Sequence, residues 1–476
     1  MPRFRFAEPS VRSSAAHRIG AAFFDALEPR VLLSGDPGVV DPPTPGEPAE
    51  PPVVVLATDG PRTPAEDPGL IIEAYALIEK GRPIAHLRND AGDWFRVDLA
   101  FAAGFTEFPD AARAEAVVDA DARVVHVIVN AGERMFAFLS IAGGRWFGSD
   151  LASADDDALL GGDGLTVFSA PESASSVGRE DFVYAATNNP DGDLIFYTRI
   201  DQLTATLSRT GPWSAQNLSE LLRDRGFEAP VFVGELASYV TPWNALTILG
   251  VDAEGDVHAV WTAPGLNGQW RTDNLSDISN APAFASTGLS VFLTDWNGVH
   301  IAGFNGDGDM LVTWWLPQFE GRWEWANFTD RLGFTPLQPE TMTTYVTPWG
   351  GLNIVGVAES GDLTVYWWTP AFLGANDTWR ETNLTRFLTT EPGRTPDGPI
   401  ELTGRLQVGF SPTFIEGFVI EPGQGRGSGD RPLPPEVSIV GADTSGGGGR
   451  YAFETQFSTW FAEDMDARAI NPFPAP

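Results

Sequence analysis

Short runs of alternating apolar and polar residues, separated by turn residues, follow one another between residues 238 and 386. In one unit the runs cover 344–347, 352–357, 362–368 and 379–385, with Gly, Pro and Ser in the breaks between them. Alternation with a period of two is typical of half-buried β-strands, and Gly or Pro breaks are typical of hairpin turns. The pattern therefore predicts units of four short antiparallel strands.

The third run of three successive units carries its large apolar residues at alternate positions. These residues are Val257, Ala259 and Trp261, then Met310, Val312 and Trp314, then Leu363, Val365 and Trp367. Residues two apart in a strand lie on the same face of its sheet. We therefore expect this face to form the core between neighbouring sheets.

A tryptophan followed four residues later by Asn or Asp, and then by a bulky apolar residue, recurs seven times. The tryptophans are Trp94, Trp146, Trp213, Trp270, Trp323, Trp379 and Trp460. They are spaced 52, 67, 57, 53, 56 and 81 residues apart. A period near fifty residues is that of a propeller blade. The sequence thus predicts an all-β fold with little helix, a seven-bladed β-propeller of four-stranded blades in which each tryptophan is a buried structural repeat on the last strand.

The domain boundaries follow from this pattern. We assign residues 53–468 to the propeller, with 53–58 as the first strand of its first blade, and 469–476 to a C-terminal tail. The seventh blade carries a Gly- and Pro-rich insertion at 421–435 and a glycine run at 446–449, with its second strand at 438–443. If each blade is contiguous in sequence, the ring closes by packing of the first blade against the seventh and not through a shared strand.

The residues before the propeller differ in composition. Residues 36–52 are acidic and Pro-rich, which is typical of an extended linker, and residues 1–35 contain five arginines and a short apolar patch. We expect the whole of 1–52 to be disordered or extended. Residues 24–34 read Phe-Asp-Ala-Leu-Glu-Pro-Arg-Val-Leu-Leu-Ser. They resemble the LEPR-XLL segment of certain bacterial proteins, although Asp25 and Gly35 stand where that pattern has Glu and Ala. The resemblance implies an N-terminal targeting segment and an exported, extracellular or cell-surface location.

Charge and composition narrow the partners. The formal net charge is −34, with one lysine, Lys80, in the whole chain. Such a surface repels nucleic acid and anionic lipid, and favours neutral or cationic partners. The chain contains no cysteine, which excludes disulfides and thiolate metal sites. No run of 18 apolar residues occurs, so we expect no transmembrane span.

Motifs for metal binding or catalysis are not found. The repeated Asn or Asp is a glycosylation sequon in form, but its recurrence at one blade position favours turn chemistry. The loops 189–193 and 305–309 alternate oxygen ligands, yet they lack the Gly and the acid that a calcium loop requires, so we interpret them as hairpin turns. The five histidines, His17, His86, His126, His258 and His300, show no metal-ligand spacing. We therefore predict no metal, no cofactor and no catalytic residue.

The candidate binding residues are tryptophans in the first hairpin of three blades, namely Trp243, Trp296 and Trp349, and their neighbours Asn244 and Asn297. Each ring could stack on the apolar face of a sugar, as could Trp315 and Trp368 on the opposite strand face. Alternatively, these rings fill the space between neighbouring blades. Three matched sites would give multivalent binding.

The repeated Tyr-Val-Thr-Pro-Trp, Gly-Asp-Leu and Tyr-Trp-Trp segments of 238–386 resemble the tectonin and fucose-lectin propellers, although an Arg/Glu/Trp sugar triad is not recognisable in each blade. That resemblance implies carbohydrate binding. Our first hypothesis is a non-enzymatic, exported or surface-associated binding protein for neutral glycans or a surface protein. Alternatives are a polysaccharide-acting hydrolase or lyase, and a structural module of an envelope assembly.

Overall fold

The computed structural model describes most of the chain beyond residue 70. The described residues are 71–89, 92–119, 124–132, 134–141, 144–151, 161–171, 181–199, 213–294, 296–317, 321–347, 350–369, 379–390, 400–411, 414–415, 418–419, 436–444, 447–454, 459–465 and 469–470. The predicted targeting segment 1–35, the linker 36–52 and the expected strand 53–58 lie outside them.

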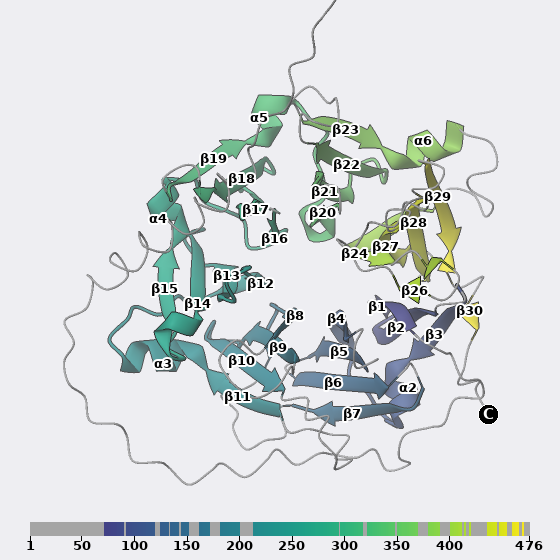
Figure 1. The fold of residues 1–476 in the computed structure, drawn as a ribbon, viewed down its shortest axis with the longest axis horizontal. Coiled ribbons are helices and arrows are strands. Elements are labelled where there is room, and N and C mark those ends of the chain that lie inside the picture. Colours follow the sequence, from purple (N-terminus) through teal and green to yellow (C-terminus); the bar gives the residue numbers. More distant parts are fainter. Residues whose placement is uncertain are drawn as a thin grey trace, which may run out of the picture.

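Seven four-stranded sheets surround a central axis (Figure 1), which confirms the predicted seven-bladed propeller. The first blade contains β1 (Ile71–Glu79), β2 (Arg82–Asn89), β3 (Trp94–Asp98) and β30 (Ala469–Ile470). The second contains β4 (Ala111–Asp119), β5 (Val124–Ala131), β6 (Arg134–Ile141) and β7 (Trp146–Asp150). The third contains β8 (Thr166–Pro171), β9 (Asp181–Asn188), β10 (Leu194–Arg199) and β11 (Trp213–Asn217).

The fourth to sixth blades are the most regular. They contain β12 (Val233–Val240), β13 (Leu246–Val251), β14 (Val257–Thr262) and β15 (Arg271–Asn274); β16 (Ser290–Leu293), β17 (Val299–Phe304), β18 (Met310–Trp315) and β19 (Trp323–Asn327); and β20 (Thr343–Val346), β21 (Leu352–Val357), β22 (Leu363–Trp368) and β23 (Arg380–Asn383). The seventh contains β24 (Leu402–Ser411), β27 (Glu436–Asp443), β28 (Gly448–Glu454) and β29 (Thr459–Asp464). A small hairpin of β25 (Phe414–Ile415) and β26 (Phe418–Val419) follows β24, so the predicted second strand 438–443 lies within β27.

The ring closes differently from our expectation. The short strand β30 follows the seventh blade in sequence, but it pairs in parallel with β3 of the first blade, joining Trp94 to Ala469 and Phe95 to Ile470. The first blade therefore shares a strand from the far end of the chain, and the expectation of seven contiguous blades is wrong at this point. The predicted tail 469–476 begins with the two residues of this strand.

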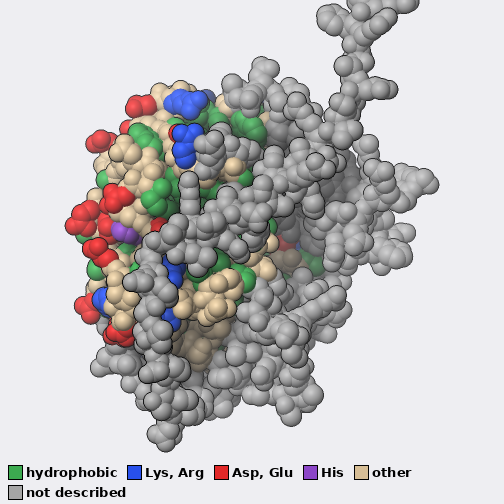
Figure 2. Space-filling view, turned by 60° about the vertical axis from the view of Figure 1, so that its left-hand side comes forward, with side chains coloured by type: hydrophobic (Ala, Val, Ile, Leu, Met, Phe, Trp, Pro, Cys, Tyr) green, Lys and Arg blue, Asp and Glu red, His purple; other side chains and the backbone are tan. Residues whose placement is uncertain are grey.

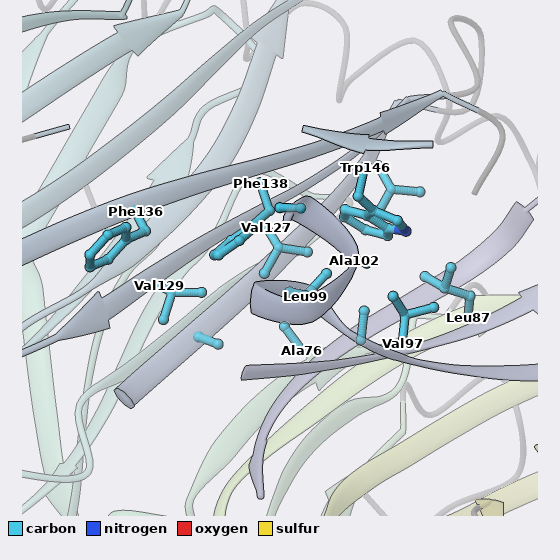
Figure 3. Packing of buried hydrophobic residues seen from close by; sticks show 14 of the residues in the cluster. Ala76, Leu87, Val97, Leu99, Ala102, Val127, Val129, Phe136, Phe138 and Trp146 are labelled. Atoms are coloured by element: carbon cyan, nitrogen blue, oxygen red, sulfur yellow. The ribbon is translucent and has the colours of Figure 1, made fainter. Parts of the chain in front are cut away.

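The faces of the third strands confirm the predicted core. Met310 and Val312 of the fifth blade pack with Leu352, Ile354 and Tyr366 of the sixth. Leu363 and Val365 of the sixth blade pack in the same way against the seventh. Figure 3 shows a corresponding cluster between the first and second blades, in which Val97 and Leu99 face Val127 and Trp146. One apolar face per blade thus fills each junction of the ring.

Short helices follow the strands that carry the repeated tryptophans, and four of the five come directly after the outermost strand of a blade (Figure 1). They are α2 (Leu99–Ala103), α3 (Leu218–Asp224), α4 (Leu275–Ser279), α5 (Phe328–Leu332) and α6 (Leu384–Thr390), and two single 3₁₀ turns, η2 (Pro264–Leu266) and η4 (Pro339–Thr341), lie elsewhere. The repeated Asn or Asp precedes each α-helix. Its side-chain oxygen accepts a hydrogen bond of 2.8 to 3.0 Å from the backbone N–H three residues later, in the order Asp98, Asn217, Asn274, Asn327 and Asn383. The repeated residue is therefore a helix N-cap, the position that Asn and Asp favour.

The side chain of the repeated Asn or Asp also bonds to the neighbouring strand. An Asn at this position pairs with an aspartate, and an Asp pairs with an arginine. In four blades the cap amide donates to an aspartate two residues before its cross-strand partner, at 2.8 to 3.0 Å: Asn217 to Asp193, Asn274 to Asp256, Asn327 to Asp309 and Asn383 to Asp362. In the first two blades the repeated residue is an aspartate, and the partner at that position is an arginine, pairing the helix cap Asp98 with Arg82 and Asp150 with Arg134. The two positions therefore differ as a pair between blades: asparagine occurs with aspartate, and aspartate with arginine.

The repeat tryptophans differ in burial. Trp94, Trp146, Trp213 and Trp270 are buried, whereas Trp323 and Trp379 are only partly buried and pack at the edges of two core clusters. The side chain of Trp460 lies outside the described residues. Five of the six described rings stand at or directly before the start of the outermost strand of their sheet, whereas Trp94 begins β3, which has β30 outside it, so the predicted last-strand position is wrong for Trp94. The prediction of burial is therefore wrong for Trp323 and Trp379; the ring of Trp379 lines an opening between blades, and that of Trp323 lies at the edge of its core cluster.

Candidate functional site

The first hairpin of the fourth to sixth blades is one repeated turn. The hydroxyl oxygens of Thr241, Thr294 and Thr347 accept hydrogen bonds of 2.8 to 2.9 Å from the backbone N–H four residues later. Asn244, Asn297 and Gly350 have φ of 61°, 63° and 80°. Only Gly and, less readily, Asn adopt such left-handed backbone. The left-handed backbone of this turn thus explains why asparagine occurs at positions 244 and 297. The role of Asn244 and Asn297 in ligand binding stays a prediction.

The hairpin tryptophans contact the next blade. Trp243 lies edge-to-face against Trp315 with ring centroids 6.4 Å apart, and Trp296 lies in the same way against Trp368 at 6.0 Å. All four rings are partly buried. Trp349 lies outside the described residues. The two interpretations of these rings are therefore compatible, since one edge of each ring packs on the neighbouring blade while part of the ring stays accessible.

An aromatic cavity of about 510 Å³ opens at the second of these pairs, between the fifth and sixth blades. We call it the Trp296 cavity. Its walls are Trp296, Val312, Trp314, Leu316, Phe328, Leu332, Leu352, Trp368 and Trp379, with His300 and Arg331 as its polar residues. Among the described residues no carboxylate lines it, although the chain carries 64 acidic residues. Burial between two blades has thus produced an aromatic site without negative charge.

A second cavity, of about 340 Å³, lies at the next junction, and we call it the Trp367 cavity. It is lined by Tyr345, Thr347, Gly351, Asn353, Val365, Trp367, Thr369, Thr382, Leu384 and Val437. The cross-strand register makes the two sites equivalent, because His300 pairs with Trp314 as Asn353 pairs with Trp367. The propeller repeat therefore builds the same pocket twice, with different residues in matching places.

The indole nitrogen of Trp367 donates a hydrogen bond of 3.0 Å to Thr382, and the guanidinium of Arg380 lies 5.3 Å from the centre of the Trp367 ring. These contacts hold Trp367 in place at the cavity wall. Asn353 donates to the backbone oxygen of Gly351 at 3.0 Å. The polar groups of this cavity are thus fixed by their own blade and carry no charge.

His300 occupies the equivalent place in the Trp296 cavity. Its ring stacks on Phe292 with centroids 4.9 Å apart, and it is 9% exposed. Among the described residues its Nε2 has no hydrogen-bond partner. Burial lowers the pKa of His300 to about 4, so the imidazole is neutral at pH 7. Sequence reasoning missed this residue, because a single histidine in a strand gives no signal without knowledge of the cavity.

Other polar clusters are used internally. One such cluster consists of Asp252, Asp256 and His258, whose potential metal-ligand atoms lie within 4.8 Å of one another. Their spacing in the sequence did not indicate a metal site. Here His258 bonds to Asp252 at 2.7 Å, and Asp256 accepts from Asn274. The predicted turn at 305–309 is closed in the same manner, since Asn305 accepts from the N–H groups of Asp307 and Asp309. These residues stabilise hairpins.

A cavity of about 330 Å³ near the inner strands is lined by Glu73, Glu115, Arg405 and Gln407, among others. The nearby carboxylate of Glu235 accepts from Arg113 and from the N–H of Gly288, and lies 3.5 Å from Arg405. Gln407 donates to backbone oxygens of the first and second blades. These polar contacts tie the inner strands of several blades together.

Figure 2 shows Asp and Glu side chains along the outer edge of one side of the ring, with few Lys or Arg between them, as the net charge of −34 requires. Within the described part of the chain, none of the helices has the length and apolar character needed to cross a membrane.

No protein-family model and no curated protein sequence matches this chain. Solved structures with a similar arrangement include a fungal lectin from Aleuria aurantia with a six-bladed β-propeller, which is 10% identical and matches over 76% of this chain and 96% of its own at a TM-score of 0.43. The BP39L lectin from Burkholderia pseudomallei is 12% identical, with 82% and 98% covered and a TM-score of 0.48. AofleA from Arthrobotrys oligospora is 10% identical, with 74% and 86% covered and a TM-score of 0.46. At these identities the likeness is one of fold, so the chemistry of this chain rests on its own residues.

Proposed function

We propose that this protein is a non-enzymatic glycan-binding propeller whose sites are the cavities between adjacent blades. The observation that carries the proposal is the repetition of one tryptophan-lined cavity at two successive junctions, in matching register. Core packing alone requires no opening at these places. A fold that repeats an accessible aromatic pocket at matching positions offers more than one contact to a polymer.

The chemistry of the walls suits a sugar. A pyranose presents an apolar C–H face that stacks on an indole ring, and hydroxyls that need fixed polar partners. The Trp367 cavity offers such partners in Asn353, Thr369 and Thr382. A single contact of this size binds weakly, and two or more on one rim raise the retention of a polymer through effective concentration. Trp243 and Trp349 hold the corresponding hairpin positions, and we include them among the proposed binding residues.

The test is a glycan array probed with the labelled full chain, followed by titration of the glycans that bind. We expect Trp296→Ala to weaken binding at least tenfold. The triple change of Trp243, Trp296 and Trp349 to Ala should abolish retention on a polymeric glycan. Trp325→Ala is the matched control, because Trp325 is 38% exposed and lines neither cavity.

Since Trp296 packs on Trp368, its removal also weakens the fold. Trp296→Phe keeps an aromatic edge there and reduces only the stacking area, so it should fold and still lose affinity. Thr369→Trp should block the Trp367 cavity from within. The proposal fails if the folded wild-type protein binds no glycan, or if the Trp296→Phe and Thr369→Trp proteins bind as well as wild type.

Residues 24–35 support a location for this activity. Their similarity to the LEPR-XLL segment leads us to propose that the protein is exported or attached to the cell surface, where glycans are exposed. Fractionation of cells producing the full chain and a chain lacking residues 1–35 tests this. The full chain should appear outside the cytoplasm and the shortened one inside it, and equal distributions would contradict the proposal.

A further inference from the structure

One rim position breaks the repeat. The fourth residue after each capping asparagine is Leu221, Ile278, Arg331 or Phe387 in the third to sixth blades. Ile278 and Phe387 are 56% and 38% exposed, which is unusual for large apolar side chains. The position is therefore apolar and outward-facing in the blades on either side of Arg331. Among these four blades, only the fifth has a charged residue here.

Arg331 belongs to the Trp296 cavity. It lies in α5 and lines the pocket together with Phe328 and Leu332 of the same helix. In the described part of the chain it forms no hydrogen bond or ion pair, although 64 acidic residues compete for only 30 basic ones. An unpaired guanidinium beside a cavity that contains no carboxylate attracts an anionic group from outside the protein.

A second polar group of the same cavity also lacks a partner. The Nε2 of His300 has no hydrogen bond among the described residues although the side chain is nine-tenths buried, and such groups are rarely left unsatisfied. The equivalent residue of the other cavity, Asn353, is already bonded to Gly351. The neutral imidazole can accept from, or donate to, a ligand hydroxyl.

We propose that the two cavities differ in selectivity: the Trp296 cavity binds a sugar residue that carries a carboxylate, such as a uronic acid, and the Trp367 cavity binds a neutral sugar. Arg331 would pair with the carboxylate, His300 would bond a hydroxyl, and the tryptophans would stack on the ring. This proposal rests on the proposed glycan binding and deepens it, because it assigns the ligand class of one site. It also departs from the expectation that a strongly acidic chain binds only neutral glycans.

The expected preference for an acidic sugar follows from the pairing of the Arg331 guanidinium with the sugar carboxylate. A guanidinium and a carboxylate form short, charge-assisted and often bidentate hydrogen bonds, which are about twice as strong as neutral ones. A methyl ester of the same sugar keeps the ring and the hydroxyls but loses the charge. We therefore expect the acid to bind about ten- to hundredfold more tightly than the ester at the Trp296 cavity. The preference should shrink as salt is raised, because Arg331 is exposed to solvent.

The experiment uses the full chain and two probes, an oligomer of galacturonate and its methyl ester, with titration calorimetry of both. The main variant is Arg331→Phe, which installs the residue that α6 has at the same position. It should lose the preference for the acid and keep the binding of the ester. The reciprocal variant, Phe387→Arg, should create a preference for the acid at the Trp367 cavity. Both changes lie on the exposed rim, so folding is not at risk.

His300→Asn separates the two polar roles. It should weaken the acid and the ester by the same factor, because the proposed hydroxyl contact is common to both. The proposal is overturned if the ester binds as tightly as the acid, or if Arg331→Phe leaves their ratio unchanged while binding persists. Absence of binding to either probe and to every glycan of the array would instead overturn the proposed function itself.

Discussion

The junction between the fifth and sixth blades and the junction between the seventh and first blades both contain an apolar cluster, but they differ in the polar groups that they bury. The first is filled by apolar and aromatic side chains and leaves the Trp296 cavity open at its rim. The second encloses charged groups. Glu79 is 3% exposed, bonds to the fully buried His86 at 2.6 Å and accepts from Arg96. The guanidinium of Arg450, 1% exposed, lies 5.3 Å from the ring of Trp94 across the closure.

The difference shows which contacts can determine the order of blades in a repeat fold. Any regular blade can pack on any other through alternating apolar faces, so these faces do not define which blades are neighbours. A buried charge is costly unless it meets its partner. Glu79, His86 and Arg96 pair within the first blade, whereas His86 and Trp94 lie against Gly448 and Arg450 of the seventh, so these cross-blade contacts are the ones that favour the seventh blade as the neighbour.

The glycine run of the seventh blade belongs to this closure. A Cβ on Gly448 would lie 2.7 Å from Cε1 of His86 and 2.8 Å from Cε of Met465. The absence of a side chain lets the seventh blade approach the first closely enough to bury His86. At Gly449 the same argument applies within the seventh blade, where a Cβ would lie 2.5 Å from Ile400.

The largest effect that tests this comparison is expected from Glu79→Ala. Removing the carboxylate breaks its bonds to the buried His86 and the partly buried Arg96, and breaking a buried pair costs about 3–5 kcal/mol. The change should lower the midpoint of denaturant unfolding accordingly. Arg223→Ala is the control, because Arg223 forms an exposed pair with Asp193 in the third blade and should cost at most about 1 kcal/mol. Equal losses in the two variants would mean that the closure is not held by its charges.

The aromatic junctions should respond to ring burial instead. Trp270 is 6% exposed and contacts Phe196 of the preceding blade at a centroid distance of 5.0 Å, so Trp270→Ala should cost about 3–5 kcal/mol. Trp323 is only partly buried, and Trp323→Ala should cost clearly less. Chemical denaturation of both variants checks the order. A larger loss of unfolding free energy for Trp323→Ala than for Trp270→Ala would show that the exposure of the ring does not predict its contribution to stability.

His300 makes one aromatic junction sensitive to pH. Its pKa is about 4 in the folded protein, against about 6.5 in an unfolded chain, so the unfolded state binds the proton first as the pH falls. Stability should be unaffected above pH 6.5 and should decline between pH 6.5 and 4, by about 2–3 kcal/mol. The His300→Asn protein should lack this part of the decline. Parallel unfolding curves at pH 7 and pH 4.5 measure it, and identical pH profiles for the two proteins would contradict the burial of this imidazole.

Much of the fold could be predicted from the sequence because the regular blades repeat. The tryptophan spacing predicts seven blades, and alternation in the third strands identifies the faces that meet. The strand β30 could not be predicted, since two residues carry no pattern and their partner lies in the first blade. The charged closure involves residues far apart in sequence, and no local rule pairs Trp94 with Arg450.

The candidate site was predicted only in outline. Trp296 stood out because it follows a repeated turn, but the fact that this turn leaves a cavity depends on how two blades pack. Arg331 and His300 could not be identified as site residues from the sequence. Each differs from the residues at the matching positions of neighbouring blades, and a single difference of this kind is indistinguishable from ordinary variation. Their significance comes from lining one pocket. The polar neighbours Asn244 and Asn297, by contrast, stood out for a reason that their positive φ explains.

The smallest effect concerns the caps, where the first two blades and the later four differ in a way that can be exchanged. In the sixth blade the amide of Asn383 donates to Asp362 at 2.8 Å, and its oxygen caps α6 by accepting from the N–H of Arg386. Asn383→Asp alone keeps the cap but places two carboxylates together, and Asp362→Arg alone removes the acceptor. Each single change should cost about 1 kcal/mol.

The double variant Asp362→Arg with Asn383→Asp recreates the arginine–aspartate arrangement that Arg82 and Asp98 form at 2.9 Å in the first blade. It should recover most of the loss, because the carboxylate still caps the helix and now meets a guanidinium. A double-mutant cycle from denaturant unfolding gives the coupling energy. A favourable coupling of about 1 kcal/mol would show that cap and partner form one exchangeable unit of the blade. Additive losses would mean that the arginine–aspartate pair of the first blade depends on its surroundings there.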